Sequence, residues 1–342
     1  MQYSLNCQNF RRFGAEIELN TLDGKIKKLN SLKGENPFGI DFIALLIKNC
    51  LKKSVEIQAW SYNFNNNYWI VKPDSSCGIE VCTPVLKGWS GLKDLIDVVE
   101  LFRSKKVSAD DRCSFHVHVD ISDLNEYQLA SVISWYIKCE HIFMDSVPSK
   151  RKVNRYCQML GLTDLFNTDY VIEPTKIIRD ISLVKYYTLN TYHFIKGGGF
   201  LDNNRKKTIE FRIAENQMCL SGFDVKNWIR LLLHFIDVMK NKDIPKNYTK
   251  DDKWTGLLWL DPEDVFDLLF NQPMSEGMTQ VRNWFINRIL TNAFNSNLPG
   301  IWSNDIRKCV YKNFINYLKK INFSGEYKKE IFDLIYDEKY II

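Results

Sequence analysis

Six segments of the chain alternate apolar and polar residues, which is the pattern of a half-buried β-strand. Successive side chains of a strand point to opposite sides, so each segment has one apolar side. The predicted strands are Phe13–Leu19, Glu56–Tyr62, Tyr68–Lys72, Ile79–Thr83, Phe115–Ile121 and Thr208–Ala214. Their apolar sides predict a sheet that needs a layer of helices packed against it.

Helical spacing of apolar residues marks four further segments of the first 245 residues. These predicted helices are Phe38–Leu51, Leu92–Arg103, Asp123–Asp145 and Val225–Met239. Asp123 is the expected N-cap of the third, because Glu126 follows three residues later as a capping-box partner. Strands and helices mix without a regular βαβ rhythm, which favours an α+β fold over a doubly wound parallel sheet.

Beyond about Pro245 the pattern becomes helical throughout. The predicted helices there are Pro262–Phe270, Met278–Thr291, Asp305–Ile321 and Lys328–Ile335. The polar stretch KNKDIPKNYTKDDK separates them from the preceding part of the chain. The sequence therefore predicts a first domain over residues 1–245 and a C-terminal helical extension over residues 246–342.

Composition narrows the class of protein. The chain has 342 residues, of which 45% are hydrophobic and 13% aromatic, so it can bury a large core and is not a disordered or fibrous protein. Its formal net charge is +5, from 46 Lys and Arg against 41 Asp and Glu. This excess is small for a nucleic-acid-binding module, which argues against a nucleic-acid partner.

Cysteine usage and apolar stretches bear on the compartment. None of the nine cysteines forms a C-x-x-C pair, so free thiols in a reducing cytoplasm are expected. The segment MQYSLNCQNFRR lacks the apolar run of a signal peptide. The longest apolar stretch, Trp228–Met239, is short and contains Arg230 and Asp237, so no membrane association is expected.

Charged residues gather on the polar side of four of the predicted strands. They are Glu16 and Glu18 on the first strand, then Glu80, then His116, His118 and Asp120, and finally Glu210 and Arg212. Four solvent-facing strands of an antiparallel sheet are the simplest explanation. Ordinary wet faces, however, use Thr, Ser, Lys and Gln freely, whereas these strands carry Glu, His, Asp and Arg almost alone.

If the four strands share a sheet, five carboxylates meet one Arg and two His. Such carboxylates repel one another unless they are protonated or bridged by cations. Mg²⁺ or Mn²⁺ suits this donor set and leaves positions open for phosphate oxygens, whereas zinc would need more His or Cys ligands. The chain contains no GxxxxGK[ST] motif, which excludes a P-loop as the route to a nucleotide.

Four segments together resemble a known family: FGAEIEL, DSSCGIEVCTP, CSFHVHVD and KKTIEFRIAEN. They are similar in order and spacing to the signature segments of the putative amidoligase family of phages and bacteria, over about residues 10–240. That family belongs to the carboxylate–amine ligase superfamily. The resemblance implies a glutamine-synthetase-like catalytic domain, with a curved antiparallel sheet and helices packed behind it.

The resemblance also implies an activity. ATP and two or three Mg²⁺ or Mn²⁺ ions would bind the concave face of the sheet. A substrate carboxylate would be phosphorylated to an acyl phosphate, which an amine then attacks. The substrates would be small molecules or peptides, and a homo-oligomer is compatible with the resemblance because glutamine synthetases build their sites between subunits.

Carried over position by position, the resemblance gives each matching residue a role. The implied metal ligands are Glu16, Glu18, Asp74, Glu80, His116 and Glu210. His118 would face the nucleotide phosphates, and Arg212 would clamp a phosphate or the transition state. With Glu80, these two residues form the expected catalytic group.

The sequence departs from the family pattern at two positions. Ser114 stands where the family usually has Gly before the HxH strand, and Thr208 stands where glutamine synthetases have an Arg. Arg205, Lys206 or Lys207 could replace that Arg in binding the nucleotide. They end the segment KGGGFLDNNRKK, which is either a mobile flap or a long hairpin loop.

Two other classes of function remain open. A metal-dependent hydrolase could use the HxHxD strand, but further His ligands at suitable strand ends are missing. A catalytically silent binding protein could keep the same fold, although the intact set of Glu and His residues argues against such decay.

Overall fold

The computed structural model describes residues 11–20, 39–58, 67–162, 178, 186–192, 207–245, 259–271, 273–292 and 304–321. Some of the sequence predictions lie outside these described residues. They are the helix Lys328–Ile335, the end of the strand Glu56–Tyr62, and the loop Lys196–Lys207 up to Lys206, which includes Arg205.

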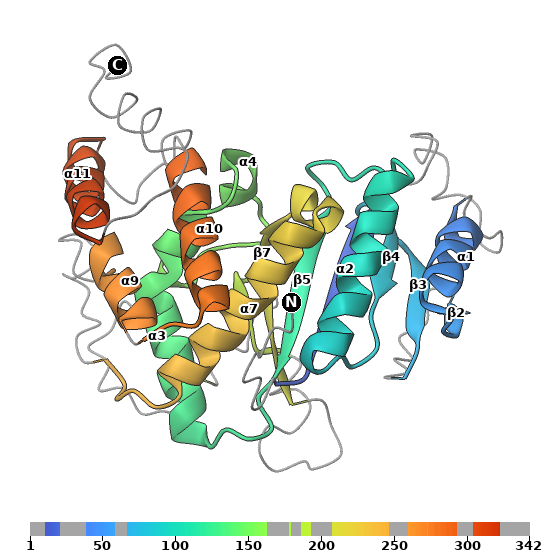
Figure 1. The fold of residues 1–342 in the computed structure, drawn as a ribbon, viewed down its shortest axis with the longest axis horizontal. Coiled ribbons are helices and arrows are strands. Elements are labelled where there is room, and N and C mark those ends of the chain that lie inside the picture. The colour runs from blue at the N-terminus through green and yellow to red at the C-terminus, as the bar shows by residue number, and fades with distance from the viewer. Residues whose placement is uncertain are drawn as a thin grey trace. The chain divides into compact units, whose positions relative to one another are not determined.

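A seven-stranded sheet, with the strands in the order β2-β3-β4-β1-β5-β7-β6, organises the first part of the fold (Figure 1). The strands are β1 (Phe13–Leu19), β2 (Val55–Ile57), β3 (Trp69–Asp74), β4 (Gly78–Cys82), β5 (Ser114–Asp120), β6 (Leu189–Asn190) and β7 (Thr208–Glu215). All neighbours pair antiparallel except β2 and β3, which are parallel. The predicted α+β class is confirmed.

The chain forms two compact units. The first comprises Met1–Asp123 and Leu189–Ile229, and the second comprises Leu124–Thr188 and Arg230–Ile342. The whole sheet belongs to the first unit. Because each unit is assembled from separate stretches of chain, the boundary near residue 245 stays a prediction.

The helices complete the two units. They are α1 (Ile40–Leu51), α2 (Gly88–Ser104), α3 (Glu126–Asp145), α4 (Ser149–Lys152), α7 (Gly222–Met239), α9 (Pro262–Phe270), α10 (Glu276–Asn292) and α11 (Asn304–Lys320), with short 3-10 turns η2 (Leu160–Leu162) and η5 (Asn216–Leu220). In the part of the chain that the structure describes, none of these helices combines the length and apolar character needed to cross a membrane.

One face of the sheet forms the core of the first unit. Its side chains are apolar and almost fully buried, and they include Ala15, Ile17, Ile79, Val81, Phe115, Val117, Val119, Ile209, Phe211 and Ile213. Burying each of the larger ones stabilises the fold by roughly 1.5–3 kcal/mol. Helix α1 contacts β2, β3 and α2, so apolar helix faces share this core. The opposite face is left for the charged residues.

A bulge in β7 changes which of its residues reach the charged face. Ala214 pairs with Phe115 but Phe211 pairs with Val117, so β7 has one extra residue between these pairs. After the bulge, Glu215 pairs with Ser114, which lies on the same side of β5 as His116. Strict alternation would have placed Glu215 on the apolar face.

The predicted start of α3 is wrong. The helix begins at Glu126, and its N-cap is Asn125, whose side chain accepts a hydrogen bond from the Gln128 amide while the Gln128 side chain accepts one from the Asn125 amide. Asp123 instead binds Arg11, with 2.6 Å between Nη2 and Oδ2. Since Asp and Asn cap helices about equally well, the pattern alone did not distinguish them.

Aromatic packing forms the core of the second unit. Phe143 of α3 meets Phe235 of α7 edge-on at a centroid distance of 5.5 Å, and Phe285 of α10 at 5.4 Å. Phe266 of α9 lies 5.5 Å from Phe285 and 5.2 Å from Phe314 of α11. These contacts tie α3 to the C-terminal helices.

Candidate functional site

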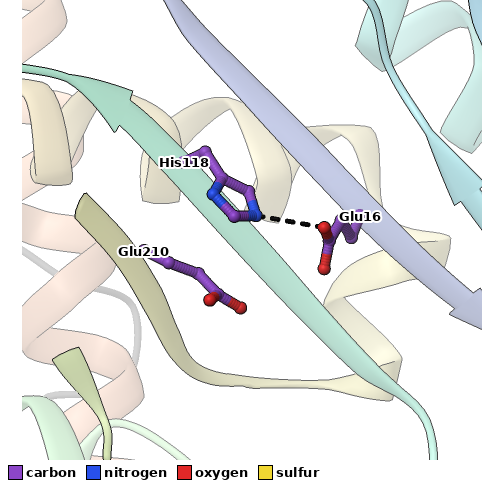
Figure 2. A group of neighbouring side chains, drawn as sticks. All are labelled: Glu16, His118 and Glu210. Atoms are coloured by element: carbon purple, nitrogen blue, oxygen red, sulfur yellow. Dashed lines mark hydrogen bonds and ion pairs between the residues drawn. The ribbon is translucent and has the colours of Figure 1, made fainter. Parts of the chain in front are cut away.

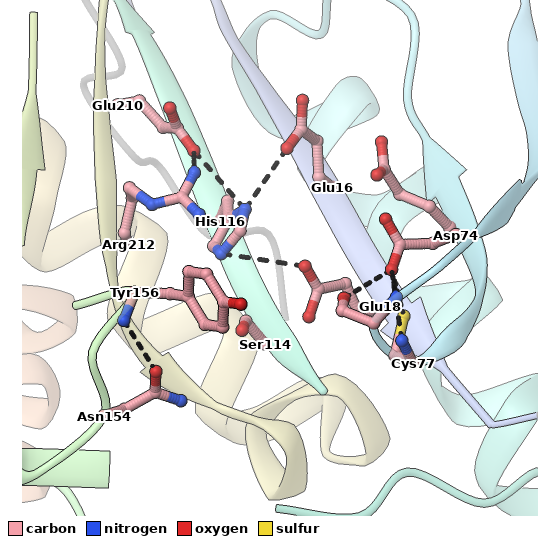
Figure 3. A network of polar contacts seen from close by, with 12 residues as sticks. Glu16, Glu18, Asp74, Cys77, Ser114, His116, Asn154, Tyr156, Glu210 and Arg212 are labelled. Atoms are coloured by element: carbon pink, nitrogen blue, oxygen red, sulfur yellow. Dashed lines mark hydrogen bonds and ion pairs between the residues drawn. The ribbon is translucent and has the colours of Figure 1, made fainter. Parts of the chain in front are cut away.

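The sheet brings the charged sides of β4, β1, β5 and β7 next to one another on one face. These strands are neighbours in that order. The directly opposite pairs are Glu18 with Glu80, Glu16 with His116, and His118 with Glu210. Residues far apart in the sequence therefore form one continuous polar surface (Figure 3).

His116 lies at the centre of this surface and is only 3% exposed. Its Nδ1 is 3.2 Å from Oε2 of Glu16 and 3.3 Å from Oε1 of Glu210, and its Nε2 is 3.9 Å from Oε1 of Glu18 (Figure 3). One imidazole thus contacts carboxylates from two flanking strands.

The Nε2 atom of His116 fits a metal ligand. It is buried, and within the described residues it has no hydrogen-bond partner. A Mg²⁺ ion lies about 2.1 Å from each ligand atom, so one ion can contact two atoms that are 3.9 Å apart. His116 and Glu18 can therefore hold one cation between them.

A second group of potential ligands is formed by Glu16, His118 and Glu210, whose ligand atoms all lie within 4.8 Å of one another (Figure 2). In this group, Nε2 of His118 is 3.1 Å from Oε1 of Glu16. A third group consists of Glu16, Glu80 and Cys82, with the same limit on its separations. Glu16 belongs to the second and the third group, so it links the β7 side of the surface to the β4 side.

Glu210 is fixed by two partners. Arg212 forms an ion pair with its Oε1, and the side-chain amide of Asn190 donates a 2.6 Å hydrogen bond to its Oε2. Asn190 lies opposite Glu210 on β6 and is 3% exposed. No sequence pattern indicated Asn190, because a strand of two residues is too short to show alternation.

Glu80 has a partner that sequence reasoning also missed. Nζ of Lys72, on β3, lies 2.8 Å from Oε1 of Glu80, and the thiol of Cys82 donates to the same oxygen at 2.9 Å. The signal was present, since Lys72 stands on the polar side of a predicted strand. Burial alone would lower the pKa of Lys72, but the Glu80 carboxylate raises it above its usual value.

Asp74 belongs to neither of the Glu16-containing groups of potential ligands. Its Oδ1 accepts hydrogen bonds from the backbone amides of Ser76 at 2.7 Å and Cys77 at 3.1 Å, and thereby holds the turn between β3 and β4. Burial would raise the pKa of Asp74, but a hydrogen bond from the Ser76 hydroxyl, together with these two from the backbone, holds it below its usual value. In this structure the Asp74 carboxylate stabilises the turn between β3 and β4.

Two other predicted residues lie at the edge of the surface. Asp120 binds Nε of Arg12 at 2.9 Å. Lys207 precedes β7, and its backbone carbonyl accepts a 2.8 Å hydrogen bond from the amide of Ile121. The nucleotide-binding role of Lys207 stays a prediction.

The protonation states of the central groups suit metal binding. Burial would raise the pKa of Glu16, but His118 and His116 outweigh it and hold the pKa well below the usual value. Burial, followed by the charge of Arg212, lowers the pKa of His116. At neutral pH these groups are an ionised carboxylate and a neutral imidazole, the forms that bind metals.

The carboxyl groups of Glu210 and Glu80 have pKa values shifted in opposite directions. Arg212, His118 and His116 overcome the effect of burial and lower the pKa of Glu210. For Glu80, burial and the neighbouring Glu16 charge raise the pKa to about 7, despite the opposing effect of Lys72. The negative charge is therefore most firmly held on the side of the surface formed by β1 and β7.

Comparison with known proteins gives the family. A family model described as "Putative amidoligase enzyme" matches residues 10–236, a stretch that includes every strand of the sheet. A search of curated proteins found no match. Among solved structures, the chain is similar to a bifunctional glutathione synthetase from Pasteurella multocida, with 11% identity and a TM-score of 0.38.

That similarity covers 95% of this chain and 52% of the glutathione synthetase chain, so this chain spans about half the length of the other protein. The family match covers well over half of the chain. It confirms the resemblance inferred from the four sequence segments. The chain therefore belongs to the putative amidoligase family, whose description is that of a ligase-type enzyme.

Proposed function

We propose that this protein is an ATP- and Mg²⁺-dependent amidoligase that joins a carboxylate to an amine through an acyl phosphate. The observation that carries the proposal is the position of His116, with Glu16, Glu18 and Glu210 all within 3.9 Å of its ring nitrogens on one sheet face. Family membership supports the same class of reaction.

The metal ions would be held by two sets of residues, Glu16 with His118 and Glu210, and His116 with Glu18. Mn²⁺ would fit the same oxygen and imidazole donors. When bound, the ions would neutralise the negative charge of the ATP phosphates during transfer. Glu18, His116 and Glu210 are 3–7% exposed, and a site with so little water strengthens electrostatic interactions.

Arg212 would stabilise the phosphoryl group as it moves. Its guanidinium is always protonated and is held in place by Glu210, so it requires no rearrangement when charge develops on the phosphate oxygens. His118 is less buried than His116, and we assign the contact with the nucleotide phosphates to the His118 ring nitrogen that does not hold the metal.

The reaction would have two steps. An oxygen of the substrate carboxylate forms a bond to the γ-phosphorus of ATP, and the bond between that phosphorus and ADP breaks. The nitrogen of the amine then forms a bond to the acyl carbon, inorganic phosphate leaves, and the amine gives up a proton. Small-molecule and peptide substrates both fit this chemistry.

Calorimetry of ATP binding, with and without Mg²⁺ or Mn²⁺, tests the proposal. We expect micromolar binding that requires the metal, and its loss in Glu18→Ala and Glu210→Ala variants that remain folded. The proposal is wrong if both variants bind nucleotide as well as the wild type. Metal binding without any nucleotide binding would instead favour the metal-dependent hydrolase.

Release of phosphate from ATP then identifies the substrates. Pairs of carboxylates and amines, including amino acids and short peptides, would be screened with Mg²⁺ and ATP. Phosphate release that needs both partners, together with an amide product of the expected mass, would establish the ligase reaction.

A further inference from the structure

An ammonium group lies inside the acidic face of the sheet. Lys72 stands directly opposite Glu80 in the pairing of β3 with β4, and the Lys72 side chain is 16% exposed. Its Nζ is 2.8 Å from Oε1 of Glu80. The charged end of Lys72 is therefore largely buried within the site and is not exposed to solvent like that of a surface lysine.

The place that this ammonium occupies borders a group of potential metal ligands. Glu16, Glu80 and Cys82 have ligand atoms within 4.8 Å of one another, as close as those of Glu16, His118 and Glu210. Geometry alone would therefore allow a divalent ion in either group.

Each group already has one cation paired with a carboxylate, Arg212 with Glu210 and Lys72 with Glu80, and the groups differ in their remaining ligand. The group with Glu210 contains an imidazole, which can offer a lone pair to a metal. In the group with Glu80, a single oxygen of that carboxylate already accepts from both the Lys72 ammonium and the Cys82 thiol. The ammonium would repel a divalent ion at this position. To bind there, the ion would have to displace the ammonium or give up water molecules from its own hydration shell.

We infer that the Lys72 ammonium is the resident cation of the Glu16–Glu80–Cys82 group, so that this group takes no divalent ion. The inference rests on the proposed metal-dependent function and refines it. The site binds its divalent ions on the β1, β5 and β7 side only, and Glu80 serves to hold Lys72.

Counting bound Mn²⁺ ions tests this assignment without any need for activity. Electron paramagnetic resonance reports free Mn²⁺, so titration of the full chain gives the number of ions bound. Lys72→Met removes the charge but keeps a long apolar side chain, and Lys72→Arg keeps the charge. Lys93→Met is the control, because Lys93 is an exposed lysine of α2 paired with Asp97.

We expect Lys72→Met to bind one more Mn²⁺ per chain than the wild type, and the extra ion to disappear when Glu80→Gln is added. Lys72→Arg and Lys93→Met should bind the wild-type number. Glu80→Gln alone should also leave that number unchanged, because Glu80 is not a ligand while Lys72 is present.

The inference is overturned if Lys72→Met binds the wild-type number of ions, or if Glu80→Gln alone loses one. Should Lys72→Met fail to fold, as judged by circular dichroism, the nearly isosteric Glu80→Gln variant still decides the question. A wild type that binds no Mn²⁺, with one ion bound by Lys72→Met, would refute the proposed function and leave this inference standing. If neither protein binds Mn²⁺, both fail.

Discussion

Glu16 and His116 face each other across neighbouring strands, and Oε2 of Glu16 lies 3.2 Å from Nδ1 of His116. The other oxygen of Glu16 is 3.1 Å from Nε2 of His118. One carboxylate on β1 thus orients both histidines of β5. A carboxylate that is hydrogen-bonded to an imidazole fixes the direction of the ring. Because Glu16 contacts both His116 and His118, it links the two proposed metal positions.

Replacing Glu16 with Gln should therefore weaken Mn²⁺ binding more than any other single change on β1. The substitution keeps the shape of the side chain but removes the charge of a ligand in the Glu16–His118–Glu210 group, and that carboxylate also contacts His116. We expect a loss of affinity above about 100-fold, measured by Mn²⁺ titration. Glu126→Gln, in the first turn of α3, is the control and should bind as the wild type does. Wild-type affinity in Glu16→Gln would contradict the central role of Glu16.

Asn190 should act as a positioning residue for Glu210. Its amide donates to one carboxylate oxygen, and an aspartate at this position would accept instead and repel Glu210. We expect Asn190→Asp to weaken Mn²⁺ binding about 10- to 100-fold, and Asn190→Ala to weaken it less. The exposed Asn241 provides the matched control, Asn241→Asp. Equal binding by both Asp variants would show that the hydrogen bond does not orient Glu210.

The alternation of apolar and polar residues predicted several strands of the sheet and the face on which the candidate site lies. It identified β1 with its full bounds, and it placed Glu16 and Glu18 on the face opposite Ile17. This prediction succeeds because the side-chain period of a strand depends only on local geometry. The family resemblance implied an antiparallel sheet, but the order of its strands was not predicted, since no local pattern contains it.

The features that sequence reasoning missed depend on how segments pair or contact one another, which the pattern within one segment does not show. The bulge that returns Glu215 to the charged face arises from how β7 pairs with β5, and alternation within β7 alone cannot show it. The role of Lys72 appears only once β3 lies beside β4. Asp123 was assigned to a helix cap because its partner Arg11 is far away in the sequence.

Arg212 should affect phosphoryl transfer much more than metal binding. Lys in its place would keep one positive charge but lose the planar, two-pronged donor. We expect Arg212→Lys to slow phosphate release about 10²- to 10³-fold, while Mn²⁺ affinity changes by less than about tenfold. Both quantities can be measured on the same preparation. A parallel loss of both would mean that Arg212 acts only by holding Glu210.

Glu140, in the second unit, should make the stability of the fold depend on pH. The carboxyl group is fully buried and accepts hydrogen bonds from the amides of Leu160 at 2.7 Å and Gly161 at 2.9 Å, and from the hydroxyl of Thr188. Burial raises its pKa from the usual 4.5 to about 7, and these hydrogen bonds oppose the rise only in part. Below about pH 4.5 the group is protonated in both the folded and the unfolded chain.

Between about pH 4.5 and 7 the unfolded chain has lost this proton while the folded chain still holds it. The free energy of unfolding should therefore fall as the pH rises through this window, by about 3 kcal/mol from this group. Glu140→Gln cannot titrate, so its urea-unfolding free energy should show a smaller decrease over the same range, whatever its stability at one pH. The comparison is between the slopes of unfolding free energy against pH. A loss of stability caused by the missing hydrogen-bond acceptor would be the same at every pH and would not change the slope. Identical slopes for the two proteins would show that Glu140 is ionised in the fold throughout, with its three donors outweighing the effect of burial.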